Sequence, residues 1–175
     1  MKQAYLNMRN FWLDTKNLEN RKGIIEIGPD HIVVAGIEMA VADGDVTKHV
    51  WLATNSLGDS SLYFENNSKS GLGGTIGGHG NEALQTAAAH MLAHASKLTA
   101  QMQSFPAGTE LPAPSAPGQV RLFALSKEKL FQVELPQAEA SNPSCIFYPF
   151  FAYSQQTLGC FRAQEGQISA STAKA

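Results

Sequence analysis

The sequence predicts an α+β fold in which an antiparallel β-sheet packs against one long helix and a C-terminal helix. Three observations lead to this prediction. Segments rich in β-branched residues are separated by turn sequences at residues 28–30 and 43–44. An alanine-rich segment at residues 81–103 has helical periodicity. Two more apolar segments, 120–125 and 130–135, flank a short polar turn, so we expect a meander followed by a hairpin, with about five to six strands.

Length and composition indicate one domain. The chain has 175 residues, of which 43% are hydrophobic and 16% are charged. A chain of this length can bury a core without disulfides or metals. We assign residues 1–166 to a single α+β domain with a proline- and alanine-rich internal connection at 105–118, and residues 167–175 to a disordered tail.

Charge and hydropathy argue against several classes of protein. A net charge of −2 does not suggest binding to nucleic acid. No apolar segment reaches the roughly 20 residues of a membrane span, and the N-terminal sequence lacks the apolar core of a secretory signal. The two cysteines, Cys145 and Cys160, are too few for a disulfide framework. We therefore expect a soluble, cytoplasmic protein that contacts neither nucleic acid nor membrane.

The first part of the chain predicts one helix followed by strands. Residues 2–19 are expected to form an amphipathic helix. Its apolar face would consist of Tyr5, Met8, Phe11 and Trp12, with Leu18 as a further candidate. Asp43 and Gly44 are a strong hairpin signal between two strands. The expected strands of the meander are residues 23–27, 31–42, 46–54 and 62–65.

The second part predicts a long helix, a hairpin and a C-terminal helix. The helix at residues 81–103 would be about 34 Å long, with Asn81 as its N-cap. A further helix at 149–161 begins with Pro149, a residue accepted in a first helical turn. The order of helix, meander, long helix, hairpin and helix is similar to that of the profilin-like and longin-like class of small domains. This resemblance concerns element order alone and implies no function.

Six of the ten residues from 71 to 80 are glycine. Since each glycine costs about 0.5–1 kcal/mol more than alanine to order, the tract costs about 3–6 kcal/mol. We expect a loop that is either mobile or ordered by the close approach of a ligand, a partner or its own sheet. Because the tract leads into a helix N-terminus, its peptide N–H groups could hold an anion. The candidate ligand-binding residues are Gly73, Gly74, Gly77, Gly78, His79, Gly80 and Asn81.

The tract does not meet the nucleotide-binding motifs. Residues 78–83 match GxGxxA, but they do not follow a strand of a parallel βαβ unit. A P-loop signature is absent from the sequence. Glu82, in the first turn of the expected helix, would also repel an incoming anion.

His90 and His94 lie one helical turn apart, the spacing at which two imidazoles can bind one metal ion. Met91 follows His90, so the glutamate of an HExxH motif is missing. His79 could supply a third ligand only if the glycine tract folded back. Because Lys97 shares their face of the helix, we expect polar surface there and no metal site.

Four short patterns suggest catalysis but lack the groups that would complete a site. Residues 58–62 resemble the GDSL block of hydrolases without its downstream Asp-x-x-His, and residues 126–129 match SxxK in a turn rather than at a helix start. The Asp-Gly-Asp sequence at 43–45 does not extend into a calcium loop. Cys160, beside Arg162, lies among apolar residues, where thiols are usually inert. We expect no catalytic residue and no cofactor.

These observations leave two functional hypotheses. The first is a non-catalytic protein-binding or assembly module, with regulatory character, that contacts another protein or a second copy of itself. The aromatic segment at 147–161 or an edge of the sheet would carry that contact. The second is a small-molecule protein that binds an anion or phosphate, or a hydrolytic enzyme, in which residues 71–80 hold the anion and His79 is a polar contact or base.

Overall fold

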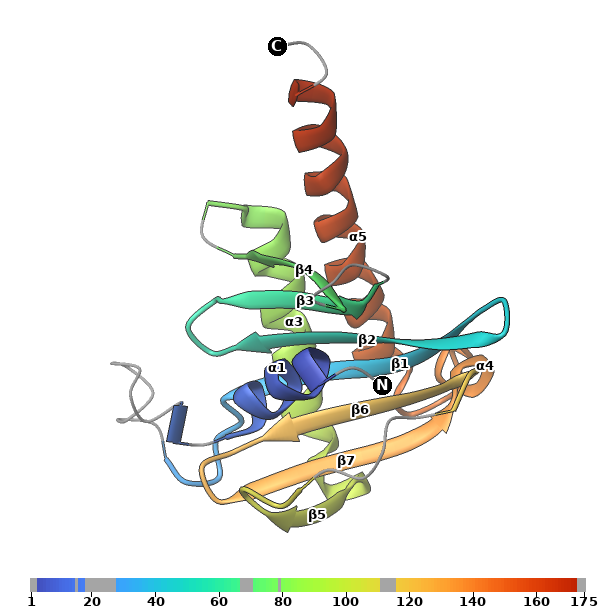
Figure 1. Ribbon diagram of the computed structural model, residues 1–175. Coiled ribbons are helices and arrows are strands. Elements are labelled where there is room, and N and C mark those ends of the chain that lie inside the picture. The colour runs from blue at the N-terminus through green and yellow to red at the C-terminus, as the bar shows by residue number, and fades with distance from the viewer. Residues whose placement is uncertain are drawn as a thin grey trace.

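The computed structural model describes residues 3–14, 16–17, 28–66, 71–78, 80–110 and 116–172. Within these residues the chain forms a seven-stranded antiparallel sheet with helices on both faces, so the predicted α+β class is confirmed (Figure 1). The strand order is β4-β3-β2-β1-β6-β7-β5. The strands are β1 (Val34–Asp43), β2 (Val46–Asn55), β3 (Ser60–Glu65), β4 (Leu72–Gly77), β5 (Gln103–Pro106), β6 (Gln119–Leu125) and β7 (Lys129–Pro136). The helices are α1 (Gln3–Leu13), α3 (Glu82–Leu98), the 3-10 helix η1 (Thr99–Gln101), α4 (Gln137–Ala140) and α5 (Tyr148–Thr172).

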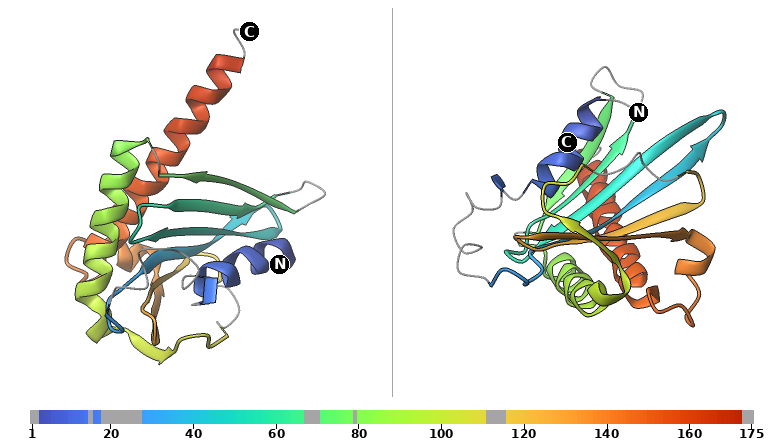
Figure 2. Two further views of the ribbon diagram at one scale, coloured as in Figure 1. Left: turned by 90° about the vertical axis from the view of Figure 1, so that its left-hand side faces the viewer. Right: turned by 90° about the horizontal axis from the view of Figure 1, so that it is seen from below.

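The sheet separates two layers of helix (Figure 2). The helices α3 and α5 cover one side, which we call the helix face, and α1 lies on the opposite side, the α1 face. Successive residues of a strand alternate between the two faces. In β1, Ile37 therefore packs toward the helices, whereas Glu38 contacts α1.

Each face carries its own apolar core. The helix-face core includes Ile37, Leu52, Leu62, Leu84, Met91, Leu122, Phe150 and Phe161. The α1-face core includes Tyr5, Trp12, Val34, Trp51, Tyr63, Phe123 and Leu130. The central strands are thus buried on both sides, and both tryptophans lie in the α1-face core.

A close ring contact crosses the centre of the sheet above Gly36. Trp51 of β2 and Phe123 of β6 flank β1, and their rings stack with centroids 4.2 Å apart and an interplanar angle of 13°. A Cβ atom at Gly36 would lie 2.3 Å from Phe123 Cζ and 2.1 Å from the Leu52 carbonyl oxygen. Glycine at this position is what allows the two rings to meet across β1.

Several predicted boundaries need correction. α1 ends at Leu13 rather than at residue 19, and the strand predicted at 23–27 lies outside the described residues. Seven strands are present in the described residues instead of five to six, because β4 lies in the glycine tract and β5 lies where the predicted helix at 81–103 meets the predicted connection at 105–118. α3 itself ends at Leu98. α5 spans Tyr148–Thr172 and is therefore longer than the helix predicted at 149–161, while the domain boundary at 166 stays a prediction. The resemblance to the profilin-like and longin-like class stays a prediction.

Candidate functional site

The glycine tract contains the outermost strand at one end of the sheet. β4 pairs antiparallel with β3, from Glu65 opposite Leu72 to Ser60 opposite Gly77. The expectation of a loop was therefore wrong for residues 72–77. Of the three agents considered, the sheet itself is the one that orders this segment.

Close contacts explain why β4 needs glycine. A Cβ atom at Gly73 would lie 2.4 Å from Phe64 Cε2, and one at Gly74 would lie 2.5 Å from the Leu62 carbonyl oxygen. A Cβ atom at Gly77 would approach the Leu84 and Phe161 side chains to 2.9 and 3.0 Å. A side chain at Gly74 would meet the backbone of β3, whereas one at Gly73 or Gly77 would displace the side chains of Phe64 or of Leu84 and Phe161.

The remaining candidate ligand residues connect β4 to α3. Gly78 and Gly80 have positive φ angles of 122° and 79°, and a Cβ atom at Gly78 would lie 2.2 Å from the Gly58 carbonyl oxygen. Asn81 is the N-cap, as predicted, and its side chain accepts a hydrogen bond of 3.0 Å from the Leu84 N–H. His79 lies outside the described residues. These residues form a tight strand-to-helix connection, and anion binding by it stays a prediction.

The hydrogen-bond pattern shows which peptide groups of β4 point outward. The Asn66 N–H donates to the Gly71 carbonyl, which makes this a hydrogen-bonded pair of the antiparallel hairpin. Bonded pairs alternate along such a ladder. Gly73, Thr75 and Gly77 therefore bond to β3, whereas the peptide groups of Gly74 and Ile76 point away from it.

The two edges of the sheet differ in how they are protected. β5 is four residues long and ends in proline, a combination that discourages pairing with another chain. β4 is six residues long, and residues 71–78 contain neither charge nor proline. The Ile76 side chain is 73% exposed on the α1 face. We call this strand, with its outward peptide groups and Ile76, the β4 edge.

α5 runs close to one end of the β4 edge. The α5 side chains of Phe161 and Gln164 lie within 4 Å of the position that a Cβ atom of Gly77 would occupy. Beyond this point α5 continues past β4, as Figure 1 and the left view of Figure 2 show. On the helix face, α5 thus extends beyond the edge of the sheet that β4 forms.

The two helical histidines contact α5. The imidazoles of His90 and His94 both stack on the Tyr153 ring, with centroids 4.8 and 5.2 Å away. His90 is exposed and His94 half-buried, so this part of α3 is a helix contact as well as polar surface. Partial burial lowers the pKa of His94, and the positive charges of Lys97 and His90 add to this effect. No cluster of three or more metal-ligating residues occurs in the described part of the chain.

A buried charge network, which the sequence did not reveal, joins α1 to the sheet. Glu38 is fully buried and accepts hydrogen bonds from the Tyr5 hydroxyl at 2.9 Å, from Arg9 at 3.3 Å and from Arg121 at 2.7 Å. Arg121 also donates to Glu134 at 2.7 Å. Burial, followed by the charge of Glu38, raises the pKa of Tyr5. The sequence feature that could have indicated the network is a charged residue inside each of two apolar strands, Glu38 in β1 and Arg121 in β6.

A second buried pair lies beside this network. His49 Nδ1 is 2.6 Å from Glu65 Oε2, and the His49 peptide N–H donates to the same oxygen at 3.0 Å. The Tyr5 ring lies 5.8 Å from the imidazole, centroid to centroid. The Glu38 network joins α1 to β1 and, through Arg121, β6 to β1 and β7. The His49–Glu65 pair joins β2 to β3.

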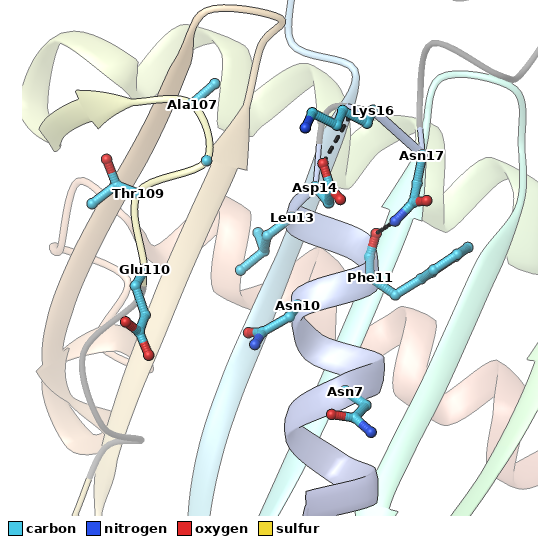
Figure 3. Close-up of a pocket in the computed structure, with 11 residues that line it drawn as sticks. Asn7, Asn10, Phe11, Leu13, Asp14, Lys16, Asn17, Ala107, Thr109 and Glu110 are labelled. Carbon is cyan, nitrogen blue, oxygen red and sulfur yellow. Dashed lines mark hydrogen bonds between the residues drawn. The ribbon is translucent and has the colours of Figure 1, made fainter.

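A pocket of about 720 Å³ lies between α1 and the segment that follows β5. Figure 3 shows the residues that line it. Its polar wall consists of Asn7, Asn10, Asp14, Lys16, Asn17, Thr109 and Glu110. Two of these groups complete the end of α1, because Asp14 accepts from the Lys16 N–H and Asn17 donates to the Phe11 carbonyl. Most of the lining is exposed, so the pocket is a surface hollow rather than an enclosed site.

A second hollow of about 480 Å³ lies on the helix face between α5 and the ends of β1, β2 and β3. Its floor is apolar, with Met39, Val50, Leu62, Phe64 and Leu158. Lys48 and Asp43 form an ion pair at its rim.

The comparisons with known proteins do not assign this chain to a family: no protein-family model matches it, and neither does any curated protein. Among the described helices, none combines the length and the apolar character needed to cross a bilayer.

Proposed function

We propose that this protein is a non-catalytic protein-binding or assembly module whose contact site is the β4 edge. The observation that carries the proposal is an outermost strand with outward peptide groups, no charge and a 73% exposed isoleucine. Unpaired strand edges are templates for pairing with another chain, and proteins usually block them with charges, proline or short strands. An edge left without such protection is the feature that strand-addition sites use.

The two carboxylates that are buried in the described part of the chain, Glu38 and Glu65, are engaged in structural contacts, which supports a binding role over a catalytic one. Glu38 is occupied by three donors, and Glu65 by the His49 ring and peptide N–H. A general base or nucleophile must instead reach a substrate from within a concave site. The partner is a second protein or another copy of this chain, and we keep the cytoplasmic location as part of the proposal. The free, partly buried thiols of Cys145 and Cys160 are compatible with a reducing compartment.

The proposal is tested by site-specific photo-crosslinking in living cells. A benzophenone amino acid replaces Ile76, and a matched control replaces Val46, which is 60% exposed at the tip of the β1–β2 hairpin and away from both sheet edges. We expect a discrete crosslinked product from position 76, either with this chain or with another protein, that position 46 does not give. The same products from both positions, or none from position 76, would contradict the proposal.

The alternative, an anion site at the start of α3, predicts a different result. An anion at a concentration about one hundred times its Kd would stabilise the folded state by about 2.7 kcal/mol. Glu82 is exposed in the first turn, so Glu82→Gln would strengthen that effect by removing a repelling charge. A thermal-shift screen with phosphates, nucleotides and carboxylates on both proteins checks this. We expect that no compound in the screen will stabilise Glu82→Gln more than it stabilises the wild type.

A further inference from the structure

We infer that the β4 edge takes up a single extended peptide segment of a partner, uncharged where it pairs, rather than the β4 edge of a second copy. This inference rests on the proposed function and names the partner for that site. Three features lead to it: the direction of the β4 peptide groups, the chemistry of the strand and the course of α5.

The peptide groups specify backbone pairing. Gly74 and Ile76 direct their N–H and C=O groups away from β3, and an added strand would bond to both residues. Glycine at positions 73 and 74 leaves little side-chain bulk along the outer side of β4. The backbone of a partner can therefore approach without displacing side chains of this chain.

The side chains specify an uncharged, apolar partner. Ile76 is the exposed apolar group of the strand, and residues opposite it on an added strand would lie on the α1 face. Residues 71–78 offer no counter-charge to a charged partner residue. A β-branched or aromatic residue opposite or diagonal to Ile76 removes its apolar surface from water, whereas a lysine or glutamate there would lose solvation without gaining an ion pair.

The course of α5 favours one strand over a second copy. Two copies of β4 pair antiparallel around a two-fold axis perpendicular to the sheet, which places both helix layers on the same side. Because α5 continues past β4 on that side, the α5 helix of each copy would be directed at the α3 and α5 helices of the other (Figures 1 and 2). A single peptide brings no helix layer, and α5 would lie behind it as it lies behind β4.

The test uses displayed random peptides of about eight residues, enough to span β4 with a residue beyond each end. The library is selected on the full-length protein and counter-selected on Ile76→Lys, with Val46→Lys as the matched control for an added charge on another exposed strand residue. We expect the enriched peptides to carry uncharged apolar residues at alternate positions. They should bind the Ile76→Lys variant at least about tenfold more weakly than the wild type, and should bind Val46→Lys as tightly as the wild type. N-methylation of alternate peptide nitrogens should abolish binding.

Two other results would overturn the inference, and they separate it from the proposed function. If sedimentation velocity shows a dimer that Ile76→Lys returns to monomer, and no peptide discriminates that variant, the occupant is a second copy and the proposed contact site stands. If the selected peptides are charged or bind Ile76→Lys equally well, and position 76 gives no crosslink, both the inference and the proposed function are wrong.

Discussion

At the scale of single residues, Gly36 is the described glycine at which an added Cβ atom would make the shortest contact. An added methyl group would meet the Leu52 carbonyl oxygen at 2.1 Å, and a backbone atom in a central strand has no alternative rotamer to adopt. We expect Gly36→Ala to lower the free energy of unfolding by about 1–3 kcal/mol or more, because overpacking forces the sheet and the Trp51–Phe123 stack apart. Urea denaturation followed by tryptophan fluorescence measures this loss.

Gly159 provides a control of opposite sign. It is exposed on α5, and nothing lies within 4 Å of the Cβ position there. Gly159→Ala should raise stability by up to about 1 kcal/mol, the difference in helix propensity between the two residues. Equal effects of the two substitutions would show that steric contact at Gly36 does not decide the outcome.

At the scale of elements, α1 is attached to the sheet through Glu38. Tyr5→Phe removes a hydrogen bond to a buried carboxylate and should cost about 1.5–3 kcal/mol. The raised pKa of Tyr5 gives this contribution a pH dependence. The unfolded state releases the phenolic proton near pH 10 while the folded state keeps it, so stability falls as pH rises above about 10.

Urea titrations across the alkaline range, for wild type and Tyr5→Phe, measure this dependence. The stability of the wild type should fall more steeply with pH than that of the variant, and the two curves should converge. Parallel curves would mean that the Tyr5 hydroxyl does not stay protonated in the folded state.

The β4 strand leads to a prediction about hydrogen exchange. The amides of Gly73 and Thr75 bond to β3, whereas those of Gly74 and Ile76 point outward. In the isolated protein we expect slower exchange at the first two positions than at the second two, measured residue by residue by NMR. Uniformly fast exchange over residues 72–77 would restore the mobile loop that the sequence predicts.

The elements that the sequence predicted well are those defined by local patterns. The long helix begins at its predicted N-cap, Asn81, and the hairpin turn at 43–44 lies between β1 and β2. β4 was not predictable from its own residues, because the Phe64 and Phe161 rings that favour glycine there belong to β3 and α5. The charge network was hidden for the same reason, since Glu38 and Arg121 are 83 residues apart in the chain.

At the scale of the whole molecule, one sheet connects two cores with different spectroscopic reporters. Trp12 and Trp51 both lie in the α1-face core, so tryptophan fluorescence reports on that side. α3 and α5 lie on the helix face and contribute most of the helix to far-ultraviolet circular dichroism. The strands between them are buried on both faces, so neither core can lose its packing while the other keeps an intact sheet.

We therefore expect a single unfolding transition with the same urea midpoint by both probes. Phe150→Ala offers a sharper check, because Phe150 is fully buried in the helix-face core, whereas both tryptophans belong to the α1-face core. It should cost about 3–5 kcal/mol and lower the fluorescence midpoint as much as the dichroism midpoint. A fluorescence transition that stayed at its wild-type midpoint would mean that α1 and its core unfold independently of the helix layer.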